Sequence, residues 1–389
     1  MPAPRALIVC PEAPYPLHGG GAFRTAAVLH YLARNYSLDA IFFSEQTRPD
    51  PRLALPPGLI QESLLVQLPV HPRNPTSRVW RNALRYLRRI PPLVDRFTCA
   101  PAPAALTEWL SGRQYEVAVL EHFWCAPFAP LVRPHAGRLV LDLHNLESEW
   151  HTRMAETERW PVSHVHRQFA AATRSLERQL LPKFDMLMVT SEREAARPGL
   201  EGAKVYPNTI PSAEPGNRPP RRFQIVFSGN LEYQPNISAV KWFGAEVWPR
   251  LQSRHPGLEW VLVGRRPEAL RGVLPLGRVR TTGEVSDARP EIGASLVAVV
   301  PILSGSGTRI KILEAWAAGT PVVSTTLGAE GLPCHAVAIA DSAGDFAASV
   351  SALIASEEER EKLAAAGRIA FNNTFTWEAG WKVLTGLGI

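Results

Sequence analysis

The sequence contains few cysteines and no long apolar run. Only four of its 389 residues are cysteine, and Cys10, Cys99, Cys125 and Cys334 form no C-x-x-C pair. This spacing gives no support for a zinc site or a disulfide framework, and it favours free thiols in a reducing compartment. No stretch of about 18 apolar residues and no basic-then-apolar leader is present, so we expect a cytoplasmic protein that does not span a membrane.

The net charge leaves several partners open. Lysine and arginine outnumber aspartate and glutamate, which gives a net charge of +6 and an isoelectric point of about 9.3. This surplus suits an anionic ligand, an anionic membrane surface or a nucleic acid, and by itself it does not choose among them. No stacking or groove-reading motif accompanies the charge, so we expect no nucleic-acid partner. The length fits two domains of roughly 150–200 residues each.

The first half of the chain alternates apolar strands with helical patterns. Residues 6–10 contain no polar side chain, which is typical of a strand buried on both faces. A loop ending in Gly19, Gly20 and Gly21 follows and leads into a helical pattern at residues 23–34. A strand, a glycine-rich loop and a helix in this order open a doubly wound α/β unit. Further strands are predicted at residues 38–43, 117–120, 139–143 and 186–190.

A second α/β series follows a proline-rich segment. We predict a first domain over residues 1–207, a linker at 208–221, a second domain over 222–372 and a terminal helical segment at 373–389. The terminal segment either crosses back to the first domain or packs as an apolar tail on the second. The second domain is predicted to contain strands at residues 225–229, 260–263, 295–301 and 321–324, and helices at 239–251, 310–318, 345–355 and 357–371.

One segment of the second domain combines residue types that bind a diphosphate. It follows the apolar strand and contains Gly305, Ser306, Gly307, Thr308, Arg309, Lys311 and Glu314. Glycines let the backbone approach an anion, N–H groups at a helix start point toward it, and Arg309 and Lys311 add positive charge. The Glu314 carboxylate, on the next turn, can accept hydrogen bonds from the two hydroxyls of a ribose. The alternative is a plain strand-to-helix turn with a solvated basic pair.

This segment, continued to residue 325, resembles the donor site of retaining GT-B enzymes of glycosyltransferase family 4, the group 1 glycosyltransferases. Further similar segments cover nearly the whole chain and lie at residues 14–21, 142–147, 205–208, 229–236, 282–285 and 375–381. The resemblance implies an α/β GT-B fold, in which two Rossmann-like domains face each other across a cleft. The N-terminal domain is then on the acceptor side, and the C-terminal domain holds the nucleotide-sugar donor.

The residues and the resemblance together indicate a set of site positions. The donor-binding candidates are Gly20, Gly21, Arg24, Gly229, Asn230, Gly264, Val285, Ser306, Gly307, Thr308 and Glu314. The catalytic candidates are Arg309, Lys311 and His144, which follows the strand at 139–143. For His144 the resemblance implies a hydrogen bond to the donor sugar instead of a role as base, whereas a lone histidine is more often structural.

Two departures from the family pattern affect the donor site. Many members have two glutamates seven residues apart, and here Glu314 matches the second while Ser306 occupies the position of the first. Sugar recognition by a carboxylate at that position is therefore in doubt. The basic pair often found in the first loop of the C-terminal domain is also missing, because residues 229–236 contain no lysine or arginine. We infer that Arg309 and Lys311 compensate the diphosphate charge in its place.

Residues 73–96 carry an unusual density of arginine. Seven arginines occur between Arg73 and Arg96, interleaved with apolar residues such as Trp80 and Leu87, and part of the segment is predicted to be an amphipathic basic helix. Its function is either peripheral docking on the inner face of an anionic membrane or binding of an anionic acceptor such as a lipid-linked diphosphate sugar. The alternative is a solvated basic face packed through its apolar side.

Together these features predict hexosyl transfer from a nucleotide diphosphate sugar, UDP- or GDP-linked, to a hydroxyl acceptor in the synthesis of a glycan, a glycolipid or a glycosylated metabolite. Retention of configuration is implied by the resemblance. No D-x-D-like pair lies in a suitable loop and two basic residues can replace a metal, so no metal or other cofactor is expected. Two other classes stay open: a GT-B nucleotide-sugar epimerase or phosphorylase, and a non-catalytic nucleotide-sugar binding protein.

Overall fold

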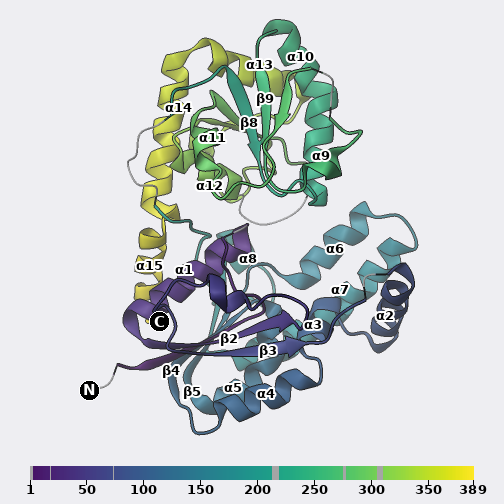
Figure 1. The fold of residues 1–389 in the computed structure, drawn as a ribbon, viewed down its shortest axis with the longest axis vertical. Helices are drawn as coiled ribbons and strands as arrows, with labels where there is room; N and C mark the ends of the chain where they lie inside the picture. The colour runs from purple at the N-terminus through teal and green to yellow at the C-terminus, as the bar shows by residue number, and fades with distance from the viewer. Residues whose placement is uncertain (1–2, 18, 73, 213–218, 275–276, 305–309) are drawn as a thin grey trace. The chain divides into compact units, whose positions relative to one another are not determined.

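The computed structural model describes residues 3–17, 19–72, 74–212, 219–274, 277–304 and 310–389. The chain divides into two compact units. Unit 1 comprises Met1–Tyr206 together with Val383–Ile389, and unit 2 comprises Pro207–Lys382. Each unit is a parallel sheet with helices packed against it, so the α/β class predicted from the strand and helix patterns is confirmed (Figure 1).

Unit 1 contains a seven-stranded parallel sheet in the order β3-β2-β1-β4-β5-β6-β7. Its strands are β1 (Arg5–Cys10), β2 (Ser37–Glu45), β3 (Glu62–Leu68), β4 (Tyr115–Glu121), β5 (Ala136–Asp142), β6 (Met186–Val189) and β7 (Lys204–Val205). Its principal helices are α1 (Gly20–Asn35), α2 (Pro75–Arg88), α3 (Pro92–Phe97), α4 (Pro101–Leu110), α5 (Ala129–Val132), α6 (Glu147–Thr157), α7 (Val162–Leu180) and α8 (Glu192–Ala195). The basic helix expected within residues 73–96 is therefore present as α2.

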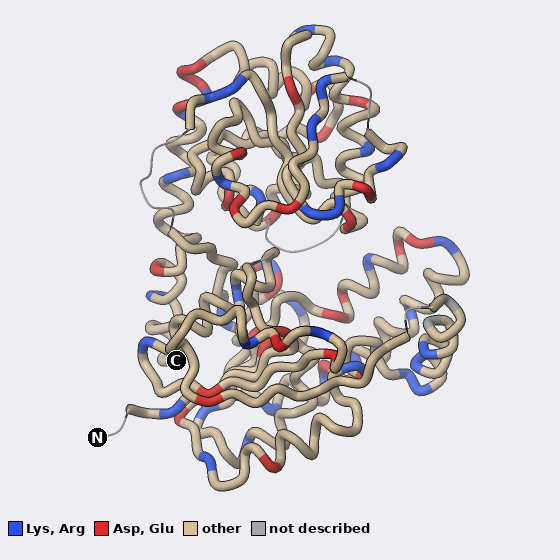
Figure 2. Tube along the Cα trace, viewed as in Figure 1, with Lys and Arg blue, Asp and Glu red and all other residues tan. Residues whose placement is uncertain are grey.

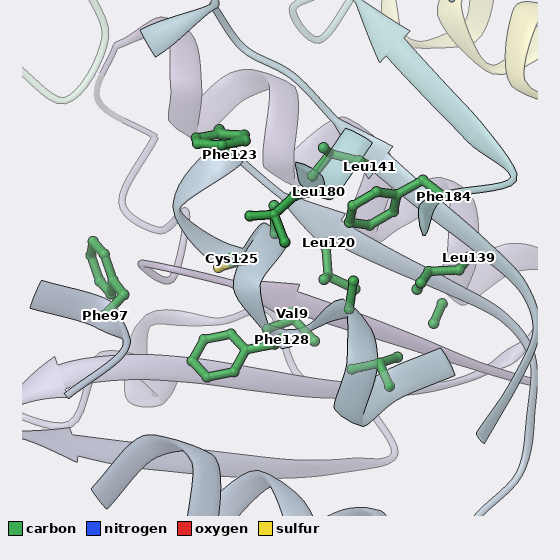
Figure 3. Close-up of a cluster of buried hydrophobic side chains, with 14 of the residues drawn as sticks. Val9, Phe97, Leu120, Phe123, Cys125, Phe128, Leu139, Leu141, Leu180 and Phe184 are labelled. Atoms are coloured by element: carbon green, nitrogen blue, oxygen red, sulfur yellow. The ribbon is translucent and has the colours of Figure 1, made fainter. Parts of the chain in front are cut away.

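One large apolar cluster of unit 1 lies between the sheet and the helices that cover one of its faces. Alternate side chains of the central strands, such as Val9, Leu120 and Leu139, pack against Phe128 and Leu180 (Figure 3). All five side chains are less than a tenth exposed. Burial of each such side chain stabilises the fold by about 1.5–3 kcal/mol, which is why the fully apolar strands form the middle of the sheet.

Unit 2 contains a six-stranded parallel sheet in the order β10-β9-β8-β11-β12-β13. Its strands are β8 (Gln224–Ser228), β9 (Glu259–Val263), β10 (Val279–Thr281), β11 (Val297–Val300), β12 (Val322–Ser324) and β13 (Ala338–Ile339). Its helices are α9 (Gln234–Trp242), α10 (Trp248–Arg254), α11 (Arg289–Gly293), α12 (Ile310–Ala317), α13 (Ala343–Ala355), α14 (Glu357–Ala370) and α15 (Trp377–Gly386). The predicted helix at 239–251 is α9 and α10 joined by one π-helical turn, Phe243–Val247.

The ends of unit 2 are held by specific backbone contacts. The amide of Ile210 donates to the carbonyl of Phe375, and the amide of Trp377 donates to the carbonyl of Ile210. The last turn of α15 belongs to unit 1, where the hydroxyl of Tyr31 donates to the carbonyl of Ile389 at 2.6 Å. Within the described residues, no helix combines the length and the apolarity needed to cross a lipid bilayer.

The strand orders place a reversal point in each sheet. In unit 1 the order reverses between β1 and β4, and in unit 2 it reverses between β8 and β11. Open parallel sheets bind ligands outside the carboxyl ends of their strands at such a point. The side chains that follow β1, β4, β5, β8 and β11 are therefore the ones to examine for chemistry.

Candidate active site

In unit 2, two glycines bring the loops after β8 and β9 into close contact. A Cβ atom added to Gly264 would lie 1.8 Å from the carbonyl oxygen of Gly229, a distance that no side chain can accommodate. The amide of Gly229 in turn donates to the carbonyl of Val263 at 2.9 Å. Glycine at position 264 is thus required by local packing.

Lys311 extends from α12 to the loop that follows β8. Its ammonium donates to Oδ1 of Asn236 at 3.1 Å and lies 3.5 Å from the position of a Cβ on Gly229. The amide nitrogen of Asn236 donates to the carbonyl of Asn230 at 2.7 Å, so the asparagine joins the lysine to the loop. The ammonium also lies 5.2 Å from the ring centre of Phe227. A positive charge from α12 therefore reaches the loop whose own sequence contains no lysine or arginine.

Glu314 lies one turn further along α12, and Ser228 at the end of β8 donates to its Oε2 at 3.3 Å. Burial raises the pKa of the Glu314 carboxyl to about 7, while nearby Lys311 opposes the rise. The carboxyl group is thus held close to Lys311, and a small change in its surroundings shifts it between its two protonation states near neutral pH.

The other predicted residues of unit 2 lie in loops or outside the described part of the chain. Asn230 uses its side-chain oxygen to accept from the amide of Glu232 at 3.1 Å. Val285 is half-buried in the loop between β10 and α11. The remaining predicted positions, Ser306, Gly307, Thr308 and Arg309, lie outside the described residues.

In unit 1, the glycine-rich loop leads directly to a histidine. Gly19 has a φ of 89° and precedes α1, which begins at Gly20. A Cβ on Gly21 would lie 3.5 Å from Nδ1 of His144 and 3.8 Å from Nε2 of His122. The predicted glycines and the predicted histidine are therefore neighbours at the carboxyl end of this sheet.

His144 is held by a carboxylate at the end of β4. Its Nε2 lies 2.7 Å from Oε2 of Glu121, and the hydroxyl of Thr25 donates to the same oxygen at 2.9 Å. With Oε2 accepting from the imidazole N–H as well as from the hydroxyl, Nδ1 of His144 is left as an acceptor toward Gly21. Burial lowers the pKa of His144 to about 3 and raises the pKa of Glu121 to about 7. The imidazole is consequently neutral at physiological pH.

A second histidine stacks on the first. The rings of His122 and His144 lie 3.6 Å apart between centres, and Trp124 stacks on the other face of His122 at 4.3 Å. His122 has a φ of 62°, a backbone conformation that costs a non-glycine residue about 1–3 kcal/mol. Burial lowers the pKa of this histidine well below its usual value. Such strain next to a buried, ordered cluster is typical of functional sites.

Arg24 does not occupy the position expected of a donor-binding residue. Its side chain is fully buried, and its Nε donates to both carboxylate oxygens of Asp142 at 3.0 and 2.8 Å. A further guanidinium nitrogen donates to the carbonyl of Tyr206 at 2.6 Å. A buried charge requires such a partner, and Asp142 supplies it from the end of β5. We therefore assign Arg24 to the support of the His144 cluster and not to direct contact with the donor.

Sequence reasoning missed Glu121, His122 and Asp142. Each lies at or directly after the end of a central strand, where parallel strands bring their last side chains together. Glu121 and Asp142, with His144, offer ligand atoms within 4.8 Å of one another, a spacing that a metal ion also requires. However, Arg24 already neutralises Asp142, and its buried positive charge repels a cation. We therefore assign no metal to this cluster.

Comparisons with known proteins bear on the fold and on the segment that forms most of unit 2. Residues 222–356 match the family model described as "Glycosyl transferases group 1". No curated protein sequence matches the chain. Among solved structures, Anabaena Alr3699/HepE in complex with UDP and glucose has a TM-score of 0.65 at 15% identity, with 98% of each chain covered.

Two further structures show the same fold. The Escherichia coli trehalose-6-phosphate structure bound with UDP-2-fluoro glucose has a TM-score of 0.61 at 14% identity and covers 98% of each chain. A mutant of Staphylococcus aureus TarM, in a complex that includes UDP, has a TM-score of 0.67 at 9% identity and covers 99% of each chain. The whole chain thus has the GT-B fold, and residues 222–356 of unit 2 match the group 1 glycosyltransferases.

Proposed function

We propose that this enzyme transfers a hexosyl group from a UDP-sugar, or less favourably a GDP-sugar, to a hydroxyl acceptor, with retention of configuration and without a metal ion. The observation that carries the proposal is the position of Lys311, whose ammonium lies at the β8 loop with Glu314 one turn away. UDP is preferred because the three similar structures are described with UDP or a UDP-sugar.

The two residues suit the two ends of a nucleoside diphosphate. Cleavage of the sugar–phosphate bond leaves negative charge on the diphosphate, and a preformed cation in a half-buried position stabilises that charge more than water does. In this proposal Lys311 supplies the cation and, together with Arg309, takes the place of the basic pair missing from the loop at 229–236. Glu314 supplies acceptor oxygens for the ribose hydroxyls.

The neutral state of His144 argues for a binding role instead of acid–base catalysis. Burial lowers its pKa to about 3, so it is a poor proton carrier near neutral pH. Its Nδ1 is available as an acceptor for a sugar hydroxyl. In the reaction we propose, the acceptor oxygen forms a bond to the anomeric carbon as the phosphate oxygen leaves, and the acceptor proton passes to that phosphate oxygen.

The basic helix α2 is the proposed contact with an anionic acceptor or with the inner face of a membrane. Its sequence from Pro75 to Arg88 contains four arginines and no acidic residue. This arrangement suits a phosphate-bearing acceptor or an anionic membrane surface.

The proposal is tested by incubating the full-length enzyme with UDP-, GDP-, ADP- and dTDP-glucose without an acceptor, with and without EDTA. We expect slow release of UDP, or more weakly of GDP, that EDTA does not change. A sugar altered while still attached to its nucleotide would show an epimerase instead. Tight binding of every donor without release, even when alkyl glycosides are offered as acceptors, would contradict transferase activity.

A further inference from the structure

An apolar groove opens in unit 1 between α2, α3, α6 and α7. It has a volume of about 800 Å³ and is lined by Val79, Ala83 and Tyr86 from α2, Leu93 from α3, Trp150 from α6 and Phe169 from α7. Ligand sites span roughly 300–1,000 Å³, so the groove has the size of a binding site for a sizeable ligand. Its described lining is mostly aliphatic and aromatic, which suits an apolar chain better than a sugar.

The groove is a built feature and not a loose gap between helices. The hydroxyl of Tyr86 pairs with Nε2 of His164 at 3.1 Å, and the side-chain amide of Gln168 donates to the carbonyl of Tyr86. Both contacts fix α2 to α7, and Figure 1 shows these two helices side by side. The groove walls are thus held apart at a defined spacing.

The inner end of the groove meets the histidine cluster. Trp124 lines the groove and stacks on His122, which stacks on His144. The indole nitrogen of Trp124 donates to Oε1 of Glu147 at 2.8 Å, so its polar edge is satisfied and its rings present apolar surface. A ligand whose apolar chain fills the groove can therefore place its polar end beside His122 and His144, the cluster to which we assign binding of the donor sugar.

The opening of the groove exposes large apolar side chains, and the helix α2 that forms one wall is basic. Val79 is 67% exposed and Trp160 is 82% exposed, and both line the opening. Large apolar side chains held in water at a groove opening indicate a binding surface. Figure 2 shows basic positions gathered along α2, the helix that forms one wall of the groove. Among the described residues, the exposed Arg88 and Arg89 at the end of α2 have no carboxylate partner.

From these observations we infer that the groove holds the apolar chain of a lipid acceptor that also carries an anionic group. This deepens the proposed function, on which it rests, by naming the acceptor class. The chain lies against Tyr86, Leu93 and Phe169, and its anionic group is attracted by Arg88 and Arg89. The acceptor hydroxyl lies at the Trp124 end, next to His122.

The test uses butyl, octyl and dodecyl phosphate as probes, below their micelle concentrations, with the full-length enzyme in a titration calorimeter. One site is expected, with affinity that tightens about fourfold per added methylene, because each buried CH2 contributes a similar transfer free energy. Ala83→Trp fills the groove from an exposed helix position and is expected to weaken the binding of dodecyl phosphate at least about tenfold. Leu53→Trp is the matched control, since Leu53 is 86% exposed on another surface of unit 1.

A charge variant separates the contribution of the anionic headgroup to the affinity from the contribution of the apolar chain. Arg88→Ser combined with Arg89→Ser is expected to weaken dodecyl phosphate while leaving uncharged dodecyl maltoside unchanged. Affinity independent of chain length, or equal affinity in Ala83→Trp and wild type, would overturn the inference. So would sedimentation with phosphatidylglycerol vesicles without any alkyl phosphate binding, which would show surface docking alone. A dimer that Ala83→Trp converts to a monomer would show that a second copy occupies the groove, and would also overturn it.

The inference and the proposed function fail in different ways. Release of UDP from UDP-glucose is measured on the same samples and depends on Lys311 in unit 2. If wild type and Ala83→Trp both release UDP but neither binds alkyl phosphates, the lipid acceptor is wrong and the transferase assignment stands. If alkyl phosphates bind with the expected chain dependence but no nucleotide sugar is turned over, the groove is correct and the transferase assignment is wrong.

Discussion

The ammonium of Lys311 lies 3.1 Å from the side-chain oxygen of Asn236. This one contact joins the first turn of α12 to the helix that follows the β8 loop, and the asparagine passes the connection on to the carbonyl of Asn230. A lysine held in this way loses little conformational entropy when a phosphate binds, because its side chain is already oriented. Under the proposed function, the contact places a positive charge at a loop that contains no basic residue of its own.

Substitution of Gly264 is expected to disrupt the β8 and β9 loops of unit 2, which belong to the proposed donor site. Gly264→Ala places a Cβ 1.8 Å from the carbonyl oxygen of Gly229, so the β8 and β9 loops must separate. We expect a loss of about 3 kcal/mol or more in stability and loss of UDP binding, measured by thermal unfolding and calorimetry. Gly257→Ala is the control, because its Cβ meets only Phe223 at an ordinary 3.7 Å. Equal behaviour of the two variants would show that the close approach is not required.

The affinity for UDP is expected to depend on the protonation of Glu314. Burial raises its pKa to about 7, and hydroxyl donors of a ribose bind the ionised carboxylate better than the protonated acid. The affinity for UDP should therefore rise as the pH increases from 5.5 to 8.5. The rise should exceed the one that ionisation of the UDP phosphates causes by itself.

Glu314→Gln removes the titrating group and isolates this contribution. We expect it to weaken UDP about tenfold at pH 8 and to flatten the pH dependence, while Glu246→Gln, at an exposed position of the same unit, follows wild type. Calorimetric titrations at four pH values measure both effects. A pH profile of the Glu314→Gln variant that runs parallel to wild type would exclude the ribose role.

Unit 1 is expected to lose stability as Glu147 ionises. Burial raises the pKa of this carboxyl to about 7 from an unfolded value near 4.5, so the folded state binds the proton more tightly. The stabilisation is present below pH 4.5 and is lost as the pH rises through 7, by up to about 3 kcal/mol. Glu147→Gln should therefore match wild type at low pH and exceed it above pH 7.

Thermal unfolding between pH 4.5 and 8.5 measures this difference through tryptophan fluorescence. Trp124 donates to Glu147 and reports the local environment. The control is Glu156→Gln, an exposed position on the same helix, α6. The expectation is wrong if the stability advantage of Glu147→Gln over Glu156→Gln does not grow with pH.

The strands that the sequence predicts and those it misses differ in burial. All nine predicted strands form, and they occupy the interior of the two sheets. The four missed strands, β3, β7, β10 and β13, are the edges of the sheets. Edge strands face solvent along one side, so β3 tolerates Glu62 and Gln67 and β10 tolerates Arg280, and the apolar pattern disappears. Strands β7 and β13 contain only two residues each, too few for any pattern.

The residues of the candidate site also divide into those that local sequence patterns predict and those that such patterns miss. The glycine loops and the segment around Lys311 are local sequence patterns, and the residue types of the segment around Lys311 by themselves indicate a diphosphate. The contact between Lys311 and Asn236 spans 75 positions, and the pairing of Arg24 with Asp142 spans 118. Such pairs depend on which strand ends meet, and nothing in the neighbouring sequence marks them. For this reason the sequence predicts Arg24 as a donor-binding residue, whereas in the structure its side chain is buried against the carboxylate of Asp142.

The central claim is that Lys311 compensates the charge of the departing diphosphate. Its most direct test is the steady-state turnover of UDP-glucose by wild type, Lys311→Ala and the exposed-lysine control Lys241→Ala. The account predicts that Lys311→Ala lowers kcat/KM by about 10²–10³-fold, with most of the loss in kcat, while Lys241→Ala stays within about twofold of wild type. A kcat/KM for Lys311→Ala equal to that of Lys241→Ala would contradict it.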